Sequence, residues 1–161
     1  MSIIEFCSGM INAFLVFLCI NVFYENLGNS ISSMTSIIVI DDDPQINSLL
    51  KDVLEFEGYH VLTAQRADEG LHYLKTTTIE LVITDVLMPD KEGLETIREL
   101  REHYPQTKIL AISGGLTKSG VDVLEIAKRL GANRVLRKPF DVQDLIKSVR
   151  LLLNANEVSS D

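Results

Sequence analysis

Four short apolar runs in this chain are each followed by acidic, hydroxyl or ammonium side chains, which can bind metal ions or exchange charge. In chain order these side chains are Asp41, Asp42 and Asp43 after residues 37–40, Asp85 after 81–84, Ser113 after 109–112, and Lys138 after 135–136. Consecutive carboxylates at the end of a buried strand repel one another at neutral pH, and a divalent metal ion is the simplest group that offsets this repulsion. The four runs are therefore followed, in chain order, by an acidic cluster, a second acid, a hydroxyl group and an ammonium group.

Short apolar runs alternate with amphipathic stretches from residue 36 onward. The spacing predicts strands at 37–40, 60–64, 79–84, 108–112 and 134–136, and helices at 44–57, 67–75, 93–104, 121–130 and 141–153. Strands of nearly continuous Val, Ile and Leu are buried on both faces, which predicts a parallel sheet with helices on each side. The fold class is therefore α/β, and such sheets bind ligands at the carboxyl ends of their strands.

Length and composition favour a single globular domain. The chain has 161 residues, of which 46% are hydrophobic, and its net charge is −8. No basic stretch exceeds two residues, which argues against nucleic acid as a direct partner because phosphate contacts need clustered Lys and Arg. Both cysteines, Cys7 and Cys19, precede the predicted domain, so that domain has no disulfide framework or Cys-based metal site. This composition suits a cytoplasmic protein.

The first 33 residues differ in composition from the rest of the chain. Residues 10–24 are almost continuously apolar, but this run of about 15 residues is shorter than a bilayer span. No Lys or Arg occurs before Lys51, so the basic region of a signal peptide is missing. We expect translation to start at Met34, a domain over 34–153 and a flexible polar tail over 154–161. A membrane anchor and a peripheral or packing segment are the alternatives for 1–33.

Taken together and in their order along the chain, the motifs resemble those of the receiver domain of bacterial two-component response regulators. The resemblance rests on the acidic cluster after the first strand, Asp-x-x-Met-Pro after the third, a hydroxyl followed by small residues after the fourth, and Lys-Pro-Phe after the fifth. It covers roughly residues 35–153. It implies a flavodoxin-like, doubly wound fold with a five-stranded parallel sheet in the order 2-1-3-4-5.

The resemblance also implies a phospho-acceptor and a Mg²⁺ site. Asp85 would attack the phosphoryl group of a phosphohistidine on a sensor histidine kinase or a histidine phosphotransfer protein. Asp42 and Asp85 would bind Mg²⁺ directly, and Asp41 would act through a bound water. The backbone carbonyl of Leu87 would complete the protein's ligands, since Mg²⁺ prefers oxygen and keeps several waters.

Two further residues acquire roles from the resemblance. Lys138 would supply a mobile positive charge to a phosphoryl oxygen, and the hydroxyl of Ser113 would follow the phosphoryl group once it is attached. The Lys138-Pro139 peptide bond would be cis, which is plausible only because the second residue is proline.

Several polar residues have simpler interpretations. Asp43 precedes Pro44 and is expected to cap the first helix. The pair Gly114-Gly115 is either a flexible turn or an opening for a partner's histidine. The three histidines, His60, His72 and His103, have no mutual spacing that suggests a metal site, so we expect them at the surface or at helix ends.

Two positions depart from the family pattern. Many receivers have Tyr or Phe three residues before the last Lys, where this chain has Val135, so an aromatic rotamer switch cannot operate in the usual way. Leu87 stands two residues after the acceptor, where polar side chains are common. An apolar side chain there cannot orient an attacking water, although Gly115 is expected to leave space for one.

The leading hypothesis is a stand-alone, chemotaxis-type receiver that signals through contacts with an unknown downstream protein. It would catalyse only its own phosphoryl transfer and dephosphorylation, and membrane association is expected only if residues 1–33 are retained. One alternative is a receiver-like binding module that works without phosphorylation. Another is a haloacid-dehalogenase-type phosphatase, which needs a second Asp where Leu87 stands.

Overall fold

The structure, a computed structural model, describes residues 34–88, 93–115 and 122–154. The predictions for residues 1–33, for the tail after residue 154 and for Pro89 of the Met-Pro motif lie outside the described residues. Within the described ranges no helix is both long and apolar enough to cross a membrane.

Strands and helices alternate along the described residues. In chain order they are β1 (Ser36–Ile40), α3 (Pro44–Phe56), β2 (His60–Ala64), α4 (Ala67–Thr76), β3 (Leu81–Asp85), α5 (Gly93–His103), β4 (Lys108–Ser113), α6 (Val123–Leu130), β5 (Arg134–Arg137) and α7 (Val142–Asn154). Each of the ten predicted elements is present. Helix α6 begins later than predicted because the Asp122 side chain caps it and accepts the Leu124 N–H at 3.0 Å.

The five strands form one parallel sheet in the order β2-β1-β3-β4-β5, which confirms the predicted fold class and topology. Ile40 pairs with Thr84, and Ser113 pairs with Arg137, so the strands reach one edge of the sheet together. The residues that follow these strand ends therefore gather at that edge.

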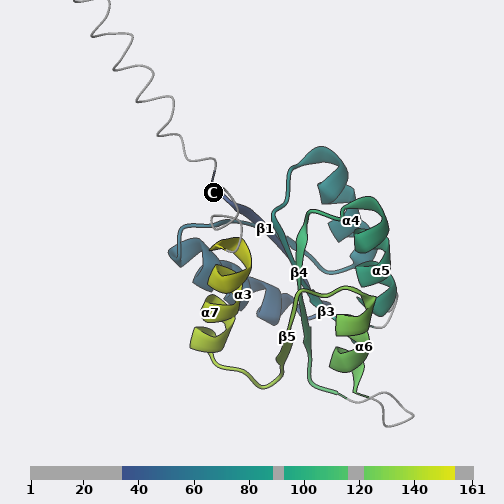
Figure 1. Ribbon diagram of the computed structural model, residues 1–161. Helices are drawn as coiled ribbons and strands as arrows, with labels where there is room; N and C mark the ends of the chain where they lie inside the picture. The colour runs from purple at the N-terminus through teal and green to yellow at the C-terminus, as the bar shows by residue number, and fades with distance from the viewer. Residues whose placement is uncertain (1–33, 89–92, 116–121, 155–161) are drawn as a thin grey trace, which may run out of the picture. The chain divides into compact units, whose positions relative to one another are not determined.

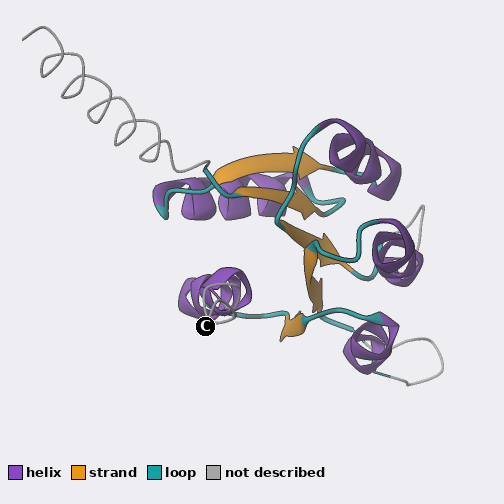
Figure 2. Cartoon of the chain, turned by 45° about the horizontal axis from the view of Figure 1, so that its top comes forward, coloured by secondary structure: helices purple, strands orange, loops and turns teal. Residues whose placement is uncertain are grey.

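Helices cover both faces of the sheet. Figures 1 and 2 show α3 and α7 on one face and α4, α5 and α6 on the other. Alternate strand residues point to opposite faces, so Ile37 and Val39 join the core under α3 and α7, while Ile38 and Ile40 join the core under the other three helices. The predicted burial of the sheet on both faces is confirmed.

The ends of α3 follow from local sequence. The Asp43 carboxylate accepts the Gln45 N–H at 2.8 Å, which confirms its predicted capping role, and Pro44 begins the helix. After the helix Gly58 adopts φ +90°, a backbone conformation that favours glycine. The buried positions of α3 are Asn47, Leu50 and Leu54.

Candidate functional site

Three carboxylates meet at the carboxyl edge of the sheet. One oxygen each from Asp41, Asp42 and Asp85 lies within 4.8 Å of the others. The backbone N–H of Asp41 bonds to the Ala64 carbonyl at 3.2 Å, so the first acid is held directly beyond β1, which lies beside β3. Asp41 is buried and Asp42 is exposed. The parallel sheet therefore brings together the acids that the sequence separates.

Lys138 reaches this cluster from the end of β5. Its Nζ donates to Asp85 Oδ2 at 2.6 Å and to Asp41 Oδ2 at 2.8 Å. Because β4 lies between β3 and β5 in the sheet, only a long side chain can cover that distance. The Lys138 backbone N–H bonds to the Ser113 carbonyl at 2.9 Å, and the Lys138-Pro139 bond is cis, as the resemblance implied.

Burial and hydrogen bonding act in opposite directions at this cluster. Burial raises the pKa of Asp41, although hydrogen bonds from Lys138 and from the Asp43 N–H partly oppose the shift. Burial alone lowers the pKa of Lys138, but its hydrogen bonds to Asp41 and Asp85 outweigh that effect and raise the pKa overall. The Lys138 ammonium therefore remains charged at neutral pH.

The Asp41 and Asp85 carboxylates are each also held by a backbone N–H. The Leu87 N–H donates to Asp85 Oδ1 at 2.8 Å, and the Asp43 N–H donates to Asp41 Oδ1 at 2.9 Å. The Asp85 side chain is only 11% exposed. Hydrogen bonds to both oxygens fix the orientation of each carboxylate, so the site is ordered before any ligand binds.

Ser113 ends β4, between the strands that supply Asp85 and Lys138. The residue is fully buried, and its Oγ accepts a long hydrogen bond of 3.5 Å from the Gly115 N–H. The neighbouring Ile112 carbonyl accepts the Val86 N–H at 2.9 Å and so ties β4 to the turn after Asp85. The hydroxyl predicted from the sequence therefore stands at the same edge of the sheet as the acids and the lysine.

Leu87 occupies the space beside Gly115. The Leu87 side chain is exposed, and a Cβ added to Gly115 would come within 2.7 Å of Leu87 Cδ1. A Leu87 methyl group therefore lies beside the position that a Gly115 side chain would take. Val135 is partly buried and packs against the core beneath α4, α5 and α6.

Sequence reasoning missed Asn47, which contacts the backbone of the acidic cluster. This residue is 5% exposed, and its Nδ2 donates to the Asp41 carbonyl at 2.7 Å and to the Ala64 carbonyl at 3.0 Å. Its position relative to Leu50 and Leu54, three and seven residues later, was the available signal, because residues at that spacing share a helical face. The histidines His60, His72 and His103 are exposed and join no candidate metal cluster among the described residues.

The donor set of this site fits Mg²⁺. Three carboxylates supply hard, negatively charged oxygens, and no sulfur or imidazole is among the clustered groups of the described residues. The exposed Asp42 leaves one side of the cluster open to water, which Mg²⁺ usually retains as a ligand.

Comparisons with known proteins agree on the class of this domain. The sequence profile of the response regulator receiver domain matches residues 37–150. The transcriptional regulatory protein CpxR of Escherichia coli (strain K12) is 35% identical over 126 residues, which cover 78% of this chain and 52% of that protein. The DNA-binding transcriptional regulator NtrC of Azospirillum brasilense is 34% identical over 124 residues, which cover 77% of this chain and 25% of NtrC. The chain thus spans about half, or less, of the length of these relatives.

Solved structures show the same fold. A CheY-like receiver domain protein from Methanospirillum hungatei JF-1 superposes with a TM-score of 0.72 at 28% identity, covering 79% of this chain and 99% of the other. A receiver domain protein from Clostridium thermocellum superposes with a TM-score of 0.70 at 32% identity, covering 79% of this chain and 100% of the other. Both similarities extend over nearly the whole of the matched structures.

The family match extends over most of the chain, and the sheet order and the acidic cluster agree with it. Domains of this family are in general signalling domains and not enzymes. They typically bind Mg²⁺ at an acidic cluster. The chain therefore belongs to the response regulator receiver domain family of two-component systems.

Proposed function

We propose that the chain receives a phosphoryl group on Asp85 from a phosphohistidine. The observation that carries this proposal is the contact between Asp85 Oδ2 and the Lys138 ammonium, at 2.6 Å, inside a cluster of three carboxylates. A carboxylate oxygen of Asp85 attacks phosphorus, a P–O bond forms, and the P–N bond to the imidazole breaks. The product is an acyl phosphate on Asp85 and a free histidine on the donor.

The residues assigned to Mg²⁺ are Asp42 and Asp85 as direct ligands, Asp41 through a bound water, and the Leu87 carbonyl. The hydrogen bond from the Leu87 N–H to Asp85 supports this assignment, since it holds the peptide of Leu87 beside the acceptor. When bound, Mg²⁺ neutralises charge on the phosphoryl oxygens during transfer. Asp41 is the least suited to direct coordination, because burial disfavours its charged form.

Lys138 and Ser113 are assigned to the phosphoryl oxygens. The ammonium of Lys138 now bonds to two carboxylates, and its flexible four-carbon stem allows it to move to a phosphoryl oxygen. Ser113 has a donor and acceptor hydroxyl at the adjoining strand end. With Leu87 apolar and covering Gly115, no side chain at these two positions can orient a water for hydrolysis.

The proposed partners follow from this chemistry. A sensor histidine kinase or a histidine phosphotransfer protein supplies the phosphoryl group, and a downstream protein reads the phosphorylated state through surface contacts. This exchange places the domain in the cytoplasm. We assign no direct nucleic-acid contact to residues 34–154, because this part of the sequence is without long basic stretches.

Incubation with acetyl phosphate tests the proposal without a cognate kinase. We expect the intact mass to increase by one phosphoryl group when Mg²⁺ is present, because the site itself provides the nucleophile and the charge compensation. Excess chelator should prevent the increase. A mass that never changes under either condition would favour a receiver-like binding module that works without phosphorylation.

Neighbouring aspartates provide a matched test of the metal assignment. Asp42→Asn should weaken Mg²⁺ binding by roughly tenfold or more, since it removes a direct ligand charge. Asp43→Asn should leave the affinity nearly unchanged, because Asp43 caps α3 and Asn is an equally good cap. Calorimetric titration of both variants decides the matter, and equal losses of affinity would contradict the division of roles.

A further inference from the structure

Asn47 is a buried polar residue in the first turns of α3 whose side chain bonds outside its own helix. Asparagine is normally disfavoured in helices because its amide competes for backbone hydrogen bonds. Here Nδ2 instead donates hydrogen bonds to two carbonyls at the sheet edge, that of Asp41 at 2.7 Å and that of Ala64 at 3.0 Å. The side chain thus joins the ends of β1 and β2 to the start of α3.

The carbonyl of Asp41 belongs to the peptide unit that connects Asp41 to Asp42. Because a peptide unit is planar, a hydrogen bond to its oxygen restricts the whole plane. That plane sets the direction in which the chain leaves Asp41 and the position of the Asp42 Cα, from which the Asp42 carboxylate projects. The same Ala64 carbonyl also accepts the Asp41 N–H at 3.2 Å, so both sides of Asp41 are tied to β2.

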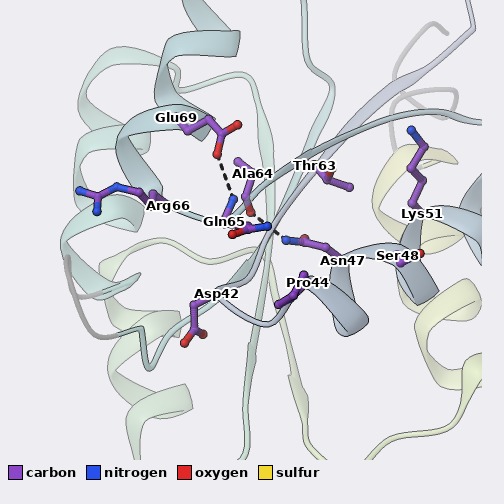
Figure 3. Close-up of a pocket in the computed structure, with 10 residues that line it drawn as sticks. All are labelled: Asp42, Pro44, Asn47, Ser48, Lys51, Thr63, Ala64, Gln65, Arg66 and Glu69. Atoms are coloured by element: carbon purple, nitrogen blue, oxygen red, sulfur yellow. Dashed lines mark hydrogen bonds between the residues drawn. The ribbon is translucent and has the colours of Figure 1, made fainter.

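The orientation of the Asn47 amide is determined by its surroundings. Two carbonyl oxygens face Nδ2, and Oδ1 has no hydrogen-bond partner among the described residues. Asn47 lines a pocket of about 730 Å³ between α3 and the turn after β2. Figure 3 shows its amide nitrogen directed at Ala64. An amide suits this place and a carboxylate does not, because the oxygens of a carboxylate would face the carbonyl oxygens of Asp41 and Ala64.

We propose that Asn47 is a positioning residue for the metal-binding acids. It holds the Asp41-Asp42 peptide so that the Asp42 carboxylate faces Asp85, and it touches neither the metal nor the phosphoryl group. This role rests on the proposed Mg²⁺ site. Outer groups that orient metal ligands commonly change metal affinity by about 10- to 100-fold when they are lost.

Mg²⁺ titration of the full chain tests the proposal. Asn47→Leu keeps the approximate size of the side chain but removes both donors, and we expect it to weaken Mg²⁺ binding by about tenfold. Leu54→Ala is the matched control, because it damages the core under the same helix without touching the Asp41-Asp42 peptide. It should bind Mg²⁺ with nearly the wild-type affinity while unfolding at lower urea concentration. If Asn47→Leu does not fold, Asn47→Ser replaces it in the titration, because Ser has a single donor and cannot bond to both carbonyls.

The outcomes separate this role from general stability and from the proposed function. Affinity loss in the Asn47 variants alone would support positioning. Unchanged affinity in those variants, or equal losses in Leu54→Ala, would overturn it while leaving the Mg²⁺ site intact. Wild-type protein that binds no Mg²⁺ would overturn the proposed function and this role with it.

Discussion

Asp85→Asn is expected to abolish phosphorylation by acetyl phosphate or by a phosphohistidine donor. The amide has the size of the carboxylate but carries no negative charge, so it is a poor nucleophile and a weak Mg²⁺ ligand. The variant should still fold, because the amide oxygen of the substituted side chain can still accept the Lys138 hydrogen bond and loss of the Asp85 charge removes a repulsion on Asp41. Intact mass spectrometry and a phosphate-affinity gel measure the result.

Asp43→Asn is the control for this loss, because Asp43 belongs to the same acidic surroundings but serves the helix cap. Asp43→Asn should be phosphorylated to the same extent as the wild type. Phosphorylation of Asp85→Asn to the wild-type extent would show that another residue accepts the phosphoryl group and would contradict the assignment of Asp85.

Lys138→Met has the second largest expected effect, and it acts on both signalling and stability. Methionine retains much of the apolar stem but removes the ammonium that bonds to Asp41 and Asp85. We expect the metal-free protein to lose about 1–3 kcal/mol of unfolding free energy, which is less than for a fully buried pair, because the carboxylates are left without their cation. Mg²⁺ should recover part of this loss. The phosphorylated variant should not show the spectral changes of phosphorylated wild type.

Lys147→Met is a suitable control, since Lys147 is an exposed residue of α7 away from the cluster. Urea unfolding with and without Mg²⁺ and amide NMR spectra of the phosphorylated proteins give the two measurements. A normal phosphorylation-induced change in Lys138→Met would contradict the role assigned to its charge.

The pH dependence of stability follows from the directions of the shifts. The folded-state pKa of Lys138 is raised above 10.5, so its contribution is complete at neutral pH and is lost as the pH rises through the folded value. Without Lys138 the pKa of Asp41 should rise further, because the hydrogen bond that lowers it is gone. The stability deficit of Lys138→Met should therefore shrink on acidification, as Asp41 becomes protonated, and also at strongly alkaline pH.

The sequence by itself determined the fold and the chemical groups of the site. Apolar runs of strand length between amphipathic stretches required a parallel sheet, and the ends of parallel strands lie at one edge. The acids, the hydroxyl and the lysine therefore had to meet there, whichever way each side chain turned. The caps of α3 were equally local, since Asp43, Pro44 and Gly58 act within a few residues of their own positions.

Only the tertiary structure decided how these groups are held. On α3 the apolar Leu49 is 53% exposed, whereas the polar Asn47 is buried and bonds to the carbonyls of Asp41 and Ala64. Leu87 likewise covers Gly115 through contact between two loops that are far apart in the sequence. Such contacts depend on which backbone groups and side chains distant segments present to one another, and no local pattern of residues contains that information.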